Sequence, residues 1–342
     1  VVSLHSTNNA FSAILSDNSV VAWGGDIDGD YNDGNIVPTG TTATSIASTF
    51  HAFAAIETDG TVQTWGDPTM GGNSAGIDWN GSSNNLDVVE IFATDYAFAA
   101  LRDDGSVVTW GNNESDAENE GGDSSSIDFN GPSNNRYVVD ITATSVAFAA
   151  LFNDGTVATW GNQLDGGNSS TIDFDGPNDD LHAVKIYSTD YAFSALLNDG
   201  SIVSWGRSEL GGDSSNVDFD GSTNDLQVVD VVANDYAFAA IRSDGSVVSW
   251  GSTSRGGDSS LENFAGKKVI GITPADRAFA ALLEDGDVVT WGDAGNGGDS
   301  SAINFVGDGN SLKVTTIVGN SAAFAAIQSD GSVVSWGRSE YG

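Results

Sequence analysis

Residues 97–111 read AFAALRDDGSVVTWG, and this stretch decides the fold because close copies of it recur along the chain. Eight copies end on a Trp-Gly pair, and they begin at Ala10, Ala52, Ala97, Ala147, Ala192, Ala237, Ala278 and Ala323. The period is about 40 to 50 residues, which is typical of propellers and other repeat architectures. We therefore expect one supersecondary unit that is used eight times.

Each copy predicts three firm strands. In the third copy, residues 88–93 are rich in β-branched residues, residues 97–101 follow after a short turn, and residues 106–110 form the next apolar run. Asp104-Gly105 lies between two apolar runs and predicts a two-residue hairpin turn. The looser segment 121–129 predicts a short outer strand. Such a unit describes a propeller blade.

A stack of the same sheets in a β-solenoid is the alternative fold. The small residues Ala99 and Ala100 favour the propeller, because its inner strands pack tightly.

The full unit reads V-x-x-I-x-A-x-x-x-A-F-A-A-L-x-x-D-G-S-V-V-x-W-G. It resembles the repeat of the regulator-of-chromosome-condensation family. That repeat carries a similar x-L-x-x-D-G-x-V-x-x-W-G stretch. Residues 20–25, followed by Val37-Pro38, resemble the bacterial branch, which includes the propeller-type β-lactamase inhibitory proteins. The resemblance implies an all-β propeller of this type. We expect eight blades in one domain over 1–342, as an excerpt of a longer protein; seven blades plus one copy from a next domain is the alternative.

The chain also departs from that family. The family has a His before the second strand, and the third copy has Ala97 at that position. The family also has Gly-Gln-Leu-Gly after the Trp, where this chain has sequences such as Gly122-Asp123-Ser124. Neither chromatin-linked nucleotide exchange nor inhibition of β-lactamase can therefore be carried over to this chain.

The charge balance excludes several classes of partner. The chain has 48 Asp and Glu against 11 Lys and Arg, a formal net charge of −37. Binding to nucleic-acid phosphates or to anionic lipid needs clustered cations, so neither is expected. No apolar run reaches about 18 residues, so no membrane insertion is expected. The acidity and the absence of Cys favour an extracellular or bacterial cell-surface location.

Antiparallel alternation of the strands places two variable segments of each copy at the same end. One is the residue before Ala-Phe, and the other follows Trp-Gly, as in residues 207–210. Variation at fixed positions of a constant scaffold is typical of a binding face. The candidate ligand-binding residues are His51, Tyr96, Tyr191, Tyr236 and Arg277. The alternative is that they are ordinary turn residues. We expect the repeated Trp to pack between blades rather than to stack on a ligand.

Acidic loops suggest calcium. Carboxylate and amide oxygens alternate in one loop, and the predicted ligands are Asp26, Asp28, Asp30 and Asn32. This loop resembles the opening of an EF-hand, but it has Tyr31 where the Gly is needed and Val37 at the twelfth position. A weaker D-x-[DN]-G pattern recurs, for example at Asp173 and Asp218. Turn chemistry explains that pattern as well as a metal does.

Enzyme signatures are missing from the sequence. The three His residues are His5, His51 and His182, and none lies in a catalytic or metal-binding spacing. We therefore predict a non-enzymatic recognition module, monomeric and without a cofactor other than calcium, that binds a protein or a glycan. A structural spacer in a large surface protein is the first alternative, and a polysaccharide-acting hydrolase is the second.

Overall fold

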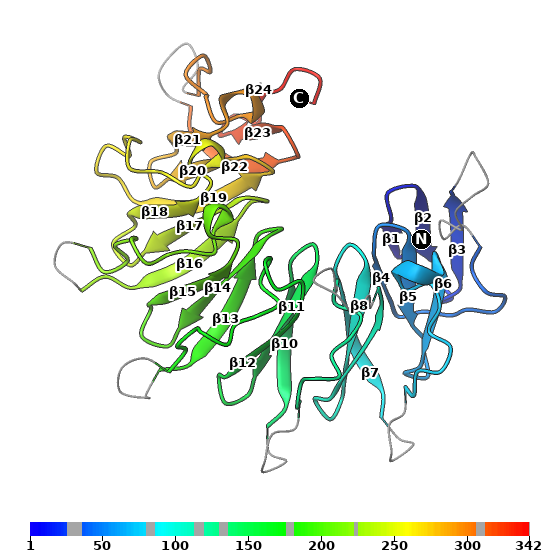
Figure 1. The fold of residues 1–342 in the computed structure, drawn as a ribbon. Coiled ribbons are helices and arrows are strands. Elements are labelled where there is room, and N and C mark those ends of the chain that lie inside the picture. The colour runs from blue at the N-terminus through cyan, green and yellow to red at the C-terminus, as the bar shows by residue number, and fades with distance from the viewer. Residues whose placement is uncertain are drawn as a thin grey trace. The chain divides into compact units, whose positions relative to one another are not determined.

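The structure is a computed structural model that describes residues 1–25, 36–79, 86–112, 120–129, 136–175, 181–221, 225–305 and 312–341. Within these residues the chain forms eight three-stranded antiparallel sheets, one for each sequence copy. We call each sheet with its loops a blade and number the blades in chain order. The chain divides into two compact units, Val1–Ser170 with blades 1 to 4 and Thr171–Gly342 with blades 5 to 8. Figure 1 shows the sheets in sequence order.

Unit 1 contains twelve strands. Its first strands are β1 (Ser3–Ser6), β4 (Ser45–Ser48), β7 (Val88–Ala93) and β10 (Val138–Ala143). Its second strands are β2 (Ala10–Ile14), β5 (Ala52–Ile56), β8 (Ala97–Arg102) and β11 (Ala147–Phe152). Its third strands are β3 (Val20–Gly24), β6 (Val62–Gly66), β9 (Val107–Gly111) and β12 (Val157–Gly161). One short 3₁₀ helix, η1 (Pro68–Met70), follows β6.

Unit 2 repeats this plan. Its first strands are β13 (Ala183–Ser188), β16 (Val228–Ala233), β19 (Val269–Ala275) and β22 (Val314–Gly319). Its second strands are β14 (Ala192–Leu197), β17 (Ala237–Arg242), β20 (Ala278–Leu283) and β23 (Ala323–Gln328). Its third strands are β15 (Ile202–Gly206), β18 (Val247–Gly251), β21 (Val288–Gly292) and β24 (Val333–Gly337). Three 3₁₀ helices follow third strands: η2 (Ser208–Leu210), η3 (Thr253–Arg255) and η4 (Ala294–Asn296).

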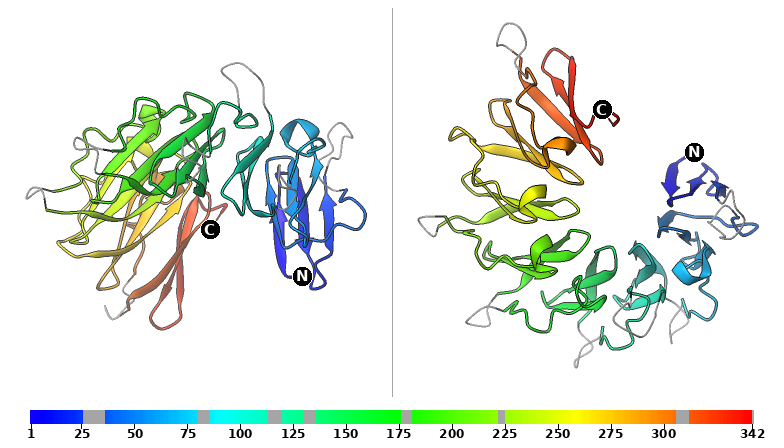
Figure 2. Two further views of the ribbon diagram at one scale, coloured as in Figure 1. Left: turned by 90° about the horizontal axis from the view of Figure 1, so that it is seen from below. Right: turned by 45° about the horizontal axis from the view of Figure 1, so that its top comes forward.

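The all-β fold class predicted from the repeat is confirmed, and the described residues form eight three-stranded blades. The three predicted strands of the third copy correspond to β7, β8 and β9 to within one residue. The four blades of each unit lie side by side in sequence order, as the right view in Figure 2 shows for unit 2.

The Ala-Phe-Ala-Ala motif explains how the blades fit together. Alternate residues of a strand point to opposite faces. In β8, Phe98 and Ala100 pack against blade 2, whereas Ala97 and Ala99 pack against blade 4. The large Phe148 of blade 4 lies in the same core cluster as these two small Ala side chains. All these residues are fully buried, so a large ring on one blade fills the space that small residues leave on the next.

The repeated Trp joins blades, as predicted. Trp110 stacks on Phe98 of its own blade at a centroid distance of 5.1 Å. Trp79, which follows blade 2, packs edge-on against the same Trp110, also at 5.1 Å. The indole Nε1 of Trp110 donates to the carbonyl oxygen of Gly71 at 3.0 Å. The Trp therefore completes its packing with the loop of the preceding blade.

The hairpin between the second and third strands is one residue longer than predicted. The Arg102 N–H donates to the Ser106 carbonyl, and the Gly105 N–H donates to the Arg102 carbonyl, both at 2.9 Å. The loop is thus Asp103-Asp104-Gly105, and Gly105 has a φ of +78°. This is the three-residue hairpin that ends in a left-handed residue. The expected two-residue turn at Asp104-Gly105 is therefore wrong in its length.

The expected outer strand is also wrong for the described part of that loop, because residues 120–129 contain no strand. Local side-chain bonds hold this segment instead. The Asp123 Oδ1 accepts a hydrogen bond from the Ser125 N–H at 2.8 Å, and the Ile127 N–H donates to the Ser124 carbonyl at 2.9 Å. Asp and Ser compete in this way with a strand ladder for the backbone groups.

Candidate functional site

The two variable segments of each blade meet at one end of the sheet, as the strand alternation predicts. In blade 5 the Arg207 N–H, directly after Trp-Gly, donates to the carbonyl of Tyr191, directly before Ala-Phe, at 3.0 Å. The same bond joins Ser252 to Tyr236 in blade 6 at 3.0 Å. In blade 7 it joins Asp293 to Arg277 at 2.9 Å. The two segments therefore form one continuous surface.

In unit 2 this surface carries a cluster of aromatic rings and guanidinium groups. Tyr191 and Tyr236 stack with centroids 5.8 Å apart and planes inclined by 22°. The Arg207 guanidinium lies 5.0 Å from the Tyr191 ring. The guanidinium groups of Arg255 and Arg277 lie 3.9 Å and 5.8 Å from the Tyr236 ring. We call these five residues the Tyr–Arg cluster.

The cluster is partly open to solvent. The Arg277 residue is exposed, and the other four residues are only partly buried. The cluster holds three of the seven Arg residues of a chain whose net charge is −37. Guanidinium groups on aromatic faces are attracted by the ring quadrupole, which orders the long side chains.

A buried polar side chain positions Tyr236 relative to Arg255. The Asn234 Oδ1 accepts hydrogen bonds from the N–H groups of Tyr236 at 2.9 Å and Ala237 at 2.8 Å. The Asn234 Nδ2 donates to the Arg255 carbonyl at 2.8 Å. In blade 5 the Thr189 hydroxyl makes the equivalent bonds, to the Tyr191 N–H at 3.2 Å and the Leu210 carbonyl at 3.1 Å. In blades 5 and 6, one side chain thus ties both variable segments together.

Three carboxylates lie on the turns that carry the cluster. Asp190, Asp235 and Asp276 directly precede Tyr191, Tyr236 and Arg277, and the Asp190 N–H donates to the Asp235 carbonyl at 3.2 Å. Burial, together with the nearby charge of Asp276, raises the pKa of Asp190 to about 6. Burial and the charges of Asp190 and Asp276 raise the pKa of Asp235 to about 7, against the opposing effect of Arg277 and Arg255.

Burial also raises the pKa of Asp276, and Arg277 opposes that shift. These carboxylates therefore repel one another in a partly desolvated position, which disfavours the ionised form. The local charge of the surface changes within the neutral pH range as a result.

The other two candidate residues lie in unit 1. The Phe50 ring makes edge contacts with both His51, at 6.5 Å between centroids, and Tyr96, at 5.6 Å. Burial raises the pKa of the Tyr96 phenol, and the charges of Glu120 and Asp95 raise it further. The structure thus brings His51 and Tyr96 together in unit 1, and Tyr191, Tyr236 and Arg277 together in unit 2.

The calcium prediction at Asp26, Asp28, Asp30 and Asn32 falls outside the described residues. For the recurring loops, turn bonds are present. The Asp173 Oδ1 accepts from the Asp175 N–H at 3.0 Å, and the Asp218 Oδ1 accepts from the Gly221 N–H at 2.7 Å. Within the described segments, no group of three or more acidic, His or Cys side chains is placed to hold a metal ion.

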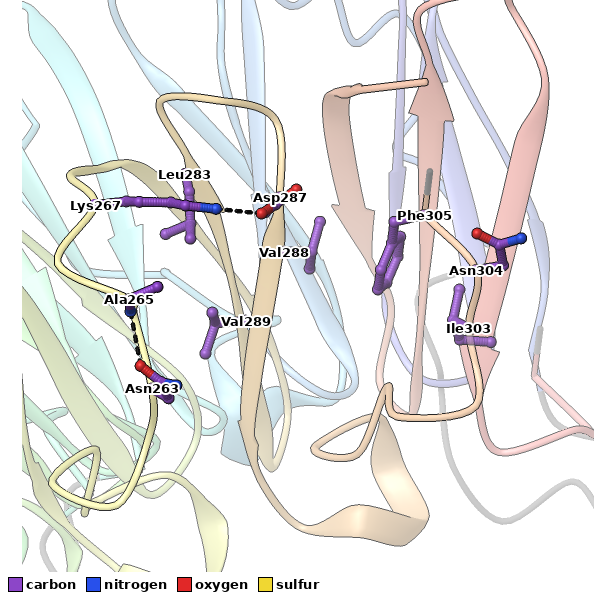
Figure 3. Close-up of a pocket in the computed structure, with 10 residues that line it drawn as sticks. All are labelled: Asn263, Ala265, Lys267, Leu283, Asp287, Val288, Val289, Ile303, Asn304 and Phe305. Carbon is purple, nitrogen blue, oxygen red and sulfur yellow. Dashed lines mark hydrogen bonds and ion pairs between the residues drawn. The ribbon is translucent and has the colours of Figure 1, made fainter. Parts of the chain in front are cut away.

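A separate pocket of about 310 Å³ lies at blade 7. Figure 3 shows Leu283, Val288 and Val289 on its walls, with Phe305 and Ile303 opposite. The Lys267 ammonium forms ion pairs with Asp287 and, at 2.6 Å, with Asp285. Its charge is therefore already offset, and the rest of the pocket lining mixes apolar side chains with the amides of Asn263 and Asn304.

Sequence reasoning missed several residues of the unit 2 surface. Asp190, Asp235 and Asp276 occupy the same place in three successive copies, directly before the variable position. Arg255 lies in the segment after Trp-Gly, which the strand alternation had already placed at the same end. The repeated placement is a signal in the sequence, but Asp is so common in turns that the placement alone does not indicate a functional site.

Comparison with known proteins supports the blade repeat. A family model described as the regulator of chromosome condensation (RCC1) repeat matches residues 88–116. The chain is similar to the crystal structure of human WBSCR16, with 17% identity over 93% of this chain and 79% of that chain and a TM-score of 0.44. It is also similar to Prp20p from Saccharomyces cerevisiae, with 17% identity over 86% and 82% of the two chains and a TM-score of 0.43.

A third similar structure is the ectodomain of the Arabidopsis thaliana receptor kinase ACR4, with 14% identity over 84% of this chain and 90% of that chain and a TM-score of 0.42. Among curated proteins, none matches this chain significantly. In the part of the chain that the structure describes, no helix has the length and apolar character needed to cross a membrane.

Proposed function

We propose that this chain is a non-enzymatic binding module that recognises a protein partner through the Tyr–Arg cluster of unit 2. The observation that carries the proposal is the stack of Tyr191 on Tyr236 with three Arg side chains around it. Tyr and Arg are the residues that most often supply the binding energy of protein interfaces, because they offer a large, ordered contact area and directed donors.

The distribution of the His residues supports a binding role over a catalytic one. His5, His51 and His182 lie in blades 1, 2 and 5. His5 shares a hydrogen bond of 2.9 Å with Ser3 on its own strand. A mechanism with His as the general base needs a nucleophile and an orienting group around the imidazole. We propose an extracellular or cell-surface location, for which the support is the acidity and the lack of Cys.

A paired-array experiment tests this function. The labelled protein is applied to a protein array and to a glycan array, with Tyr236→Ala and Tyr96→Ala as variants. We expect signals on the protein array that Tyr236→Ala removes and that Tyr96→Ala, a change at the same position of a unit 1 blade, retains. Circular dichroism confirms that both variants are folded. Signals that survive Tyr236→Ala, or that occur only on glycans, would contradict the proposal.

A further inference from the structure

The charges around the Tyr–Arg cluster restrict what it can bind. Arg207, Arg255 and Arg277 contribute three positive charges to a surface on an otherwise strongly acidic chain. Guanidinium groups select carboxylates, because their planar donors match the two carboxylate oxygens. At physiological salt the Debye length is about 8 Å, so the distant acidic side chains are largely screened and the local cations dominate a close encounter.

The adjoining turns add opposing charges. Asp190, Asp235 and Asp276 lie on three successive turns, and the backbone bond from Asp190 to Asp235 couples two of them directly. The remaining charged groups on the segments packed around them are Arg207 and Glu209 beside η2, Arg255 on η3, Arg277 on the third turn and Asp293 before η4. When all three turn carboxylates are ionised, they offset the three Arg charges.

We propose that the Tyr–Arg cluster accepts an acidic peptide segment of a protein partner, and that Asp190, Asp235 and Asp276 weaken this binding when they are ionised. The inference rests on the proposed function and adds to it the chemistry of the partner and a form of regulation. Burial raises the pKa values of all three carboxyl groups, and neighbouring carboxylates raise those of Asp190 and Asp235 further, to about 6 and about 7. Asp190 and Asp235 therefore lose charge as the pH falls toward 6. The acidic side chains of the partner remain ionised there, since an exposed Glu has a pKa of about 4.3.

The direction of the pH effect follows from these charges. Above pH 8 the three turn carboxylates are ionised and repel the acidic segment. Between pH 8 and pH 5.5 Asp235 and Asp190 take up protons, so the Arg charges are less opposed. Binding therefore strengthens on mild acidification and weakens on return to alkaline pH.

A short synthetic peptide of alternating Glu and Gly tests the inference. Fluorescence polarisation of the labelled peptide at 150 mM salt measures its affinity for the full chain between pH 8 and pH 5.5. We expect the wild-type affinity to rise about tenfold over this range, which corresponds to about 1.4 kcal/mol. The Asp235→Asn variant replaces the carboxylate by a neutral group of the same shape. Its affinity at pH 8 should rise several-fold, and its pH dependence should be smaller.

Two Arg variants show where the peptide binds. Arg277→Gln changes an exposed member of the cluster and should lower the affinity at every pH, whereas Arg338→Gln removes the same charge in blade 8, where that Arg contacts Tyr341, and should leave the affinity unchanged. A pH-independent affinity, or equal losses in the two Arg variants, would overturn the inference. If the peptide does not bind but Tyr236→Ala still removes signals from the protein array, the inference fails and the proposed function stands. If both assays are negative, both fail.

Discussion

Tyr191 and Tyr236 belong to different blades, yet their rings stack at 5.8 Å and each ring also contacts an Arg side chain. The contact joins two positions that the sequence repeat presents as equivalent. The conformation of each Tyr ring thus depends on the ring of the neighbouring blade. The binding surface of unit 2 is therefore formed by adjacent blades together and not by each blade alone.

The first prediction concerns this stack. Tyr191→Ala and Tyr236→Ala should each lower the free energy of unfolding by about 1–2 kcal/mol, because each removes partly buried ring area. The double variant should lose less than the sum, with a coupling energy of about 0.5–1.5 kcal/mol. Urea denaturation measures all three values. As a control, the losses in unfolding free energy caused by Tyr341→Ala and Tyr236→Ala should add to within about 0.5 kcal/mol. If the losses caused by Tyr191→Ala and Tyr236→Ala also add strictly, the two rings are not in direct contact.

Asn234 is predicted to be a positioning residue. Asn234→Ala should lower the free energy of unfolding by about 1–3 kcal/mol, since it leaves buried backbone groups without partners. The same variant should weaken binding of the acidic peptide at pH 6, because Tyr236 and Arg255 are no longer tied together. Asn234→Thr supplies the side chain that blade 5 uses at Thr189 and should recover most of both properties. A variant that loses stability but keeps its full affinity would argue against the positioning role.

Gly→Ala variants at two positions distinguish the destabilisation caused by steric crowding from that caused by backbone strain. Gly211 has a φ of +111°, and a Cβ placed there would lie 2.6 Å from Cε2 of the buried Phe238. Gly331 has a φ of +86°, with no atom within 4 Å of such a Cβ. Gly331→Ala should cost about 1–2 kcal/mol for the left-handed conformation alone. Gly211→Ala should lower the free energy of unfolding by about 1–3 kcal/mol more than Gly331→Ala does, because its Cβ overpacks the core. Thermal unfolding compares them, and equal losses would show that the crowding is relieved.

The turn carboxylates predict how stability depends on pH. Asp235 and Asp190 have folded-state pKa values of about 7 and about 6, above the ordinary value of 3.8. Between about pH 4 and pH 7 the folded state therefore binds more protons than the unfolded state, so these groups make the free energy of unfolding fall as the pH rises. Asp235→Asn should raise stability at pH 8 on the order of 1 kcal/mol and flatten the slope. Urea midpoints at pH 5 and pH 8 measure this effect; an unchanged slope would count against the raised pKa values.

Carboxylates in the hairpins act in the opposite direction at lower pH. The Asp244 Oδ1 accepts hydrogen bonds from the Ser246 N–H and hydroxyl, and these bonds lower its pKa. The stability that such groups contribute is present above their ordinary pKa and is lost as the pH falls below it. The two effects therefore occur in different pH ranges and can be separated.

Much of the fold could be predicted from the sequence because the same strand pattern recurs in eight copies. The apolar runs at residues 97–101 and 106–110 predicted the second and third strands, and the Trp-Gly pair marked the end of each copy. The length of the hairpin was predicted wrongly, because Asp-Gly occurs in two-residue and three-residue turns and only the position of the bond to Arg102 distinguishes them. The outer segment was overestimated because local Asp and Ser bonds compete with pairing.

The site was only partly predictable. Tyr191, Tyr236 and Arg277 were identified from their variable position, but their contacts depend on neighbouring blades and on side-chain directions. The sequence does not encode the desolvation of Asp235 in any local pattern, since its pKa depends on burial and on carboxylates from two other turns. The contribution of Arg255 arises in the same way, from a loop that meets the ring only after folding.

The packing of each Trp against the preceding loop has a consequence for where one repeat ends. Phe174 follows blade 4 in the sequence but packs edge-on against Trp205 of blade 5, at 5.3 Å. The division between the two compact units correspondingly falls at Ser170 and Thr171, inside the loop and not at the Trp-Gly pair. The aromatic contacts, however, keep each loop with the blade that follows it, so the module that could be duplicated or deleted intact runs from one Trp-Gly pair to the next. A gene rearrangement cut directly after Trp-Gly would keep Phe174 with Trp205 and Gly71 with Trp110, whereas a cut inside the loop between Gly71 and Trp79 would separate the Gly71 carbonyl from the Trp110 indole.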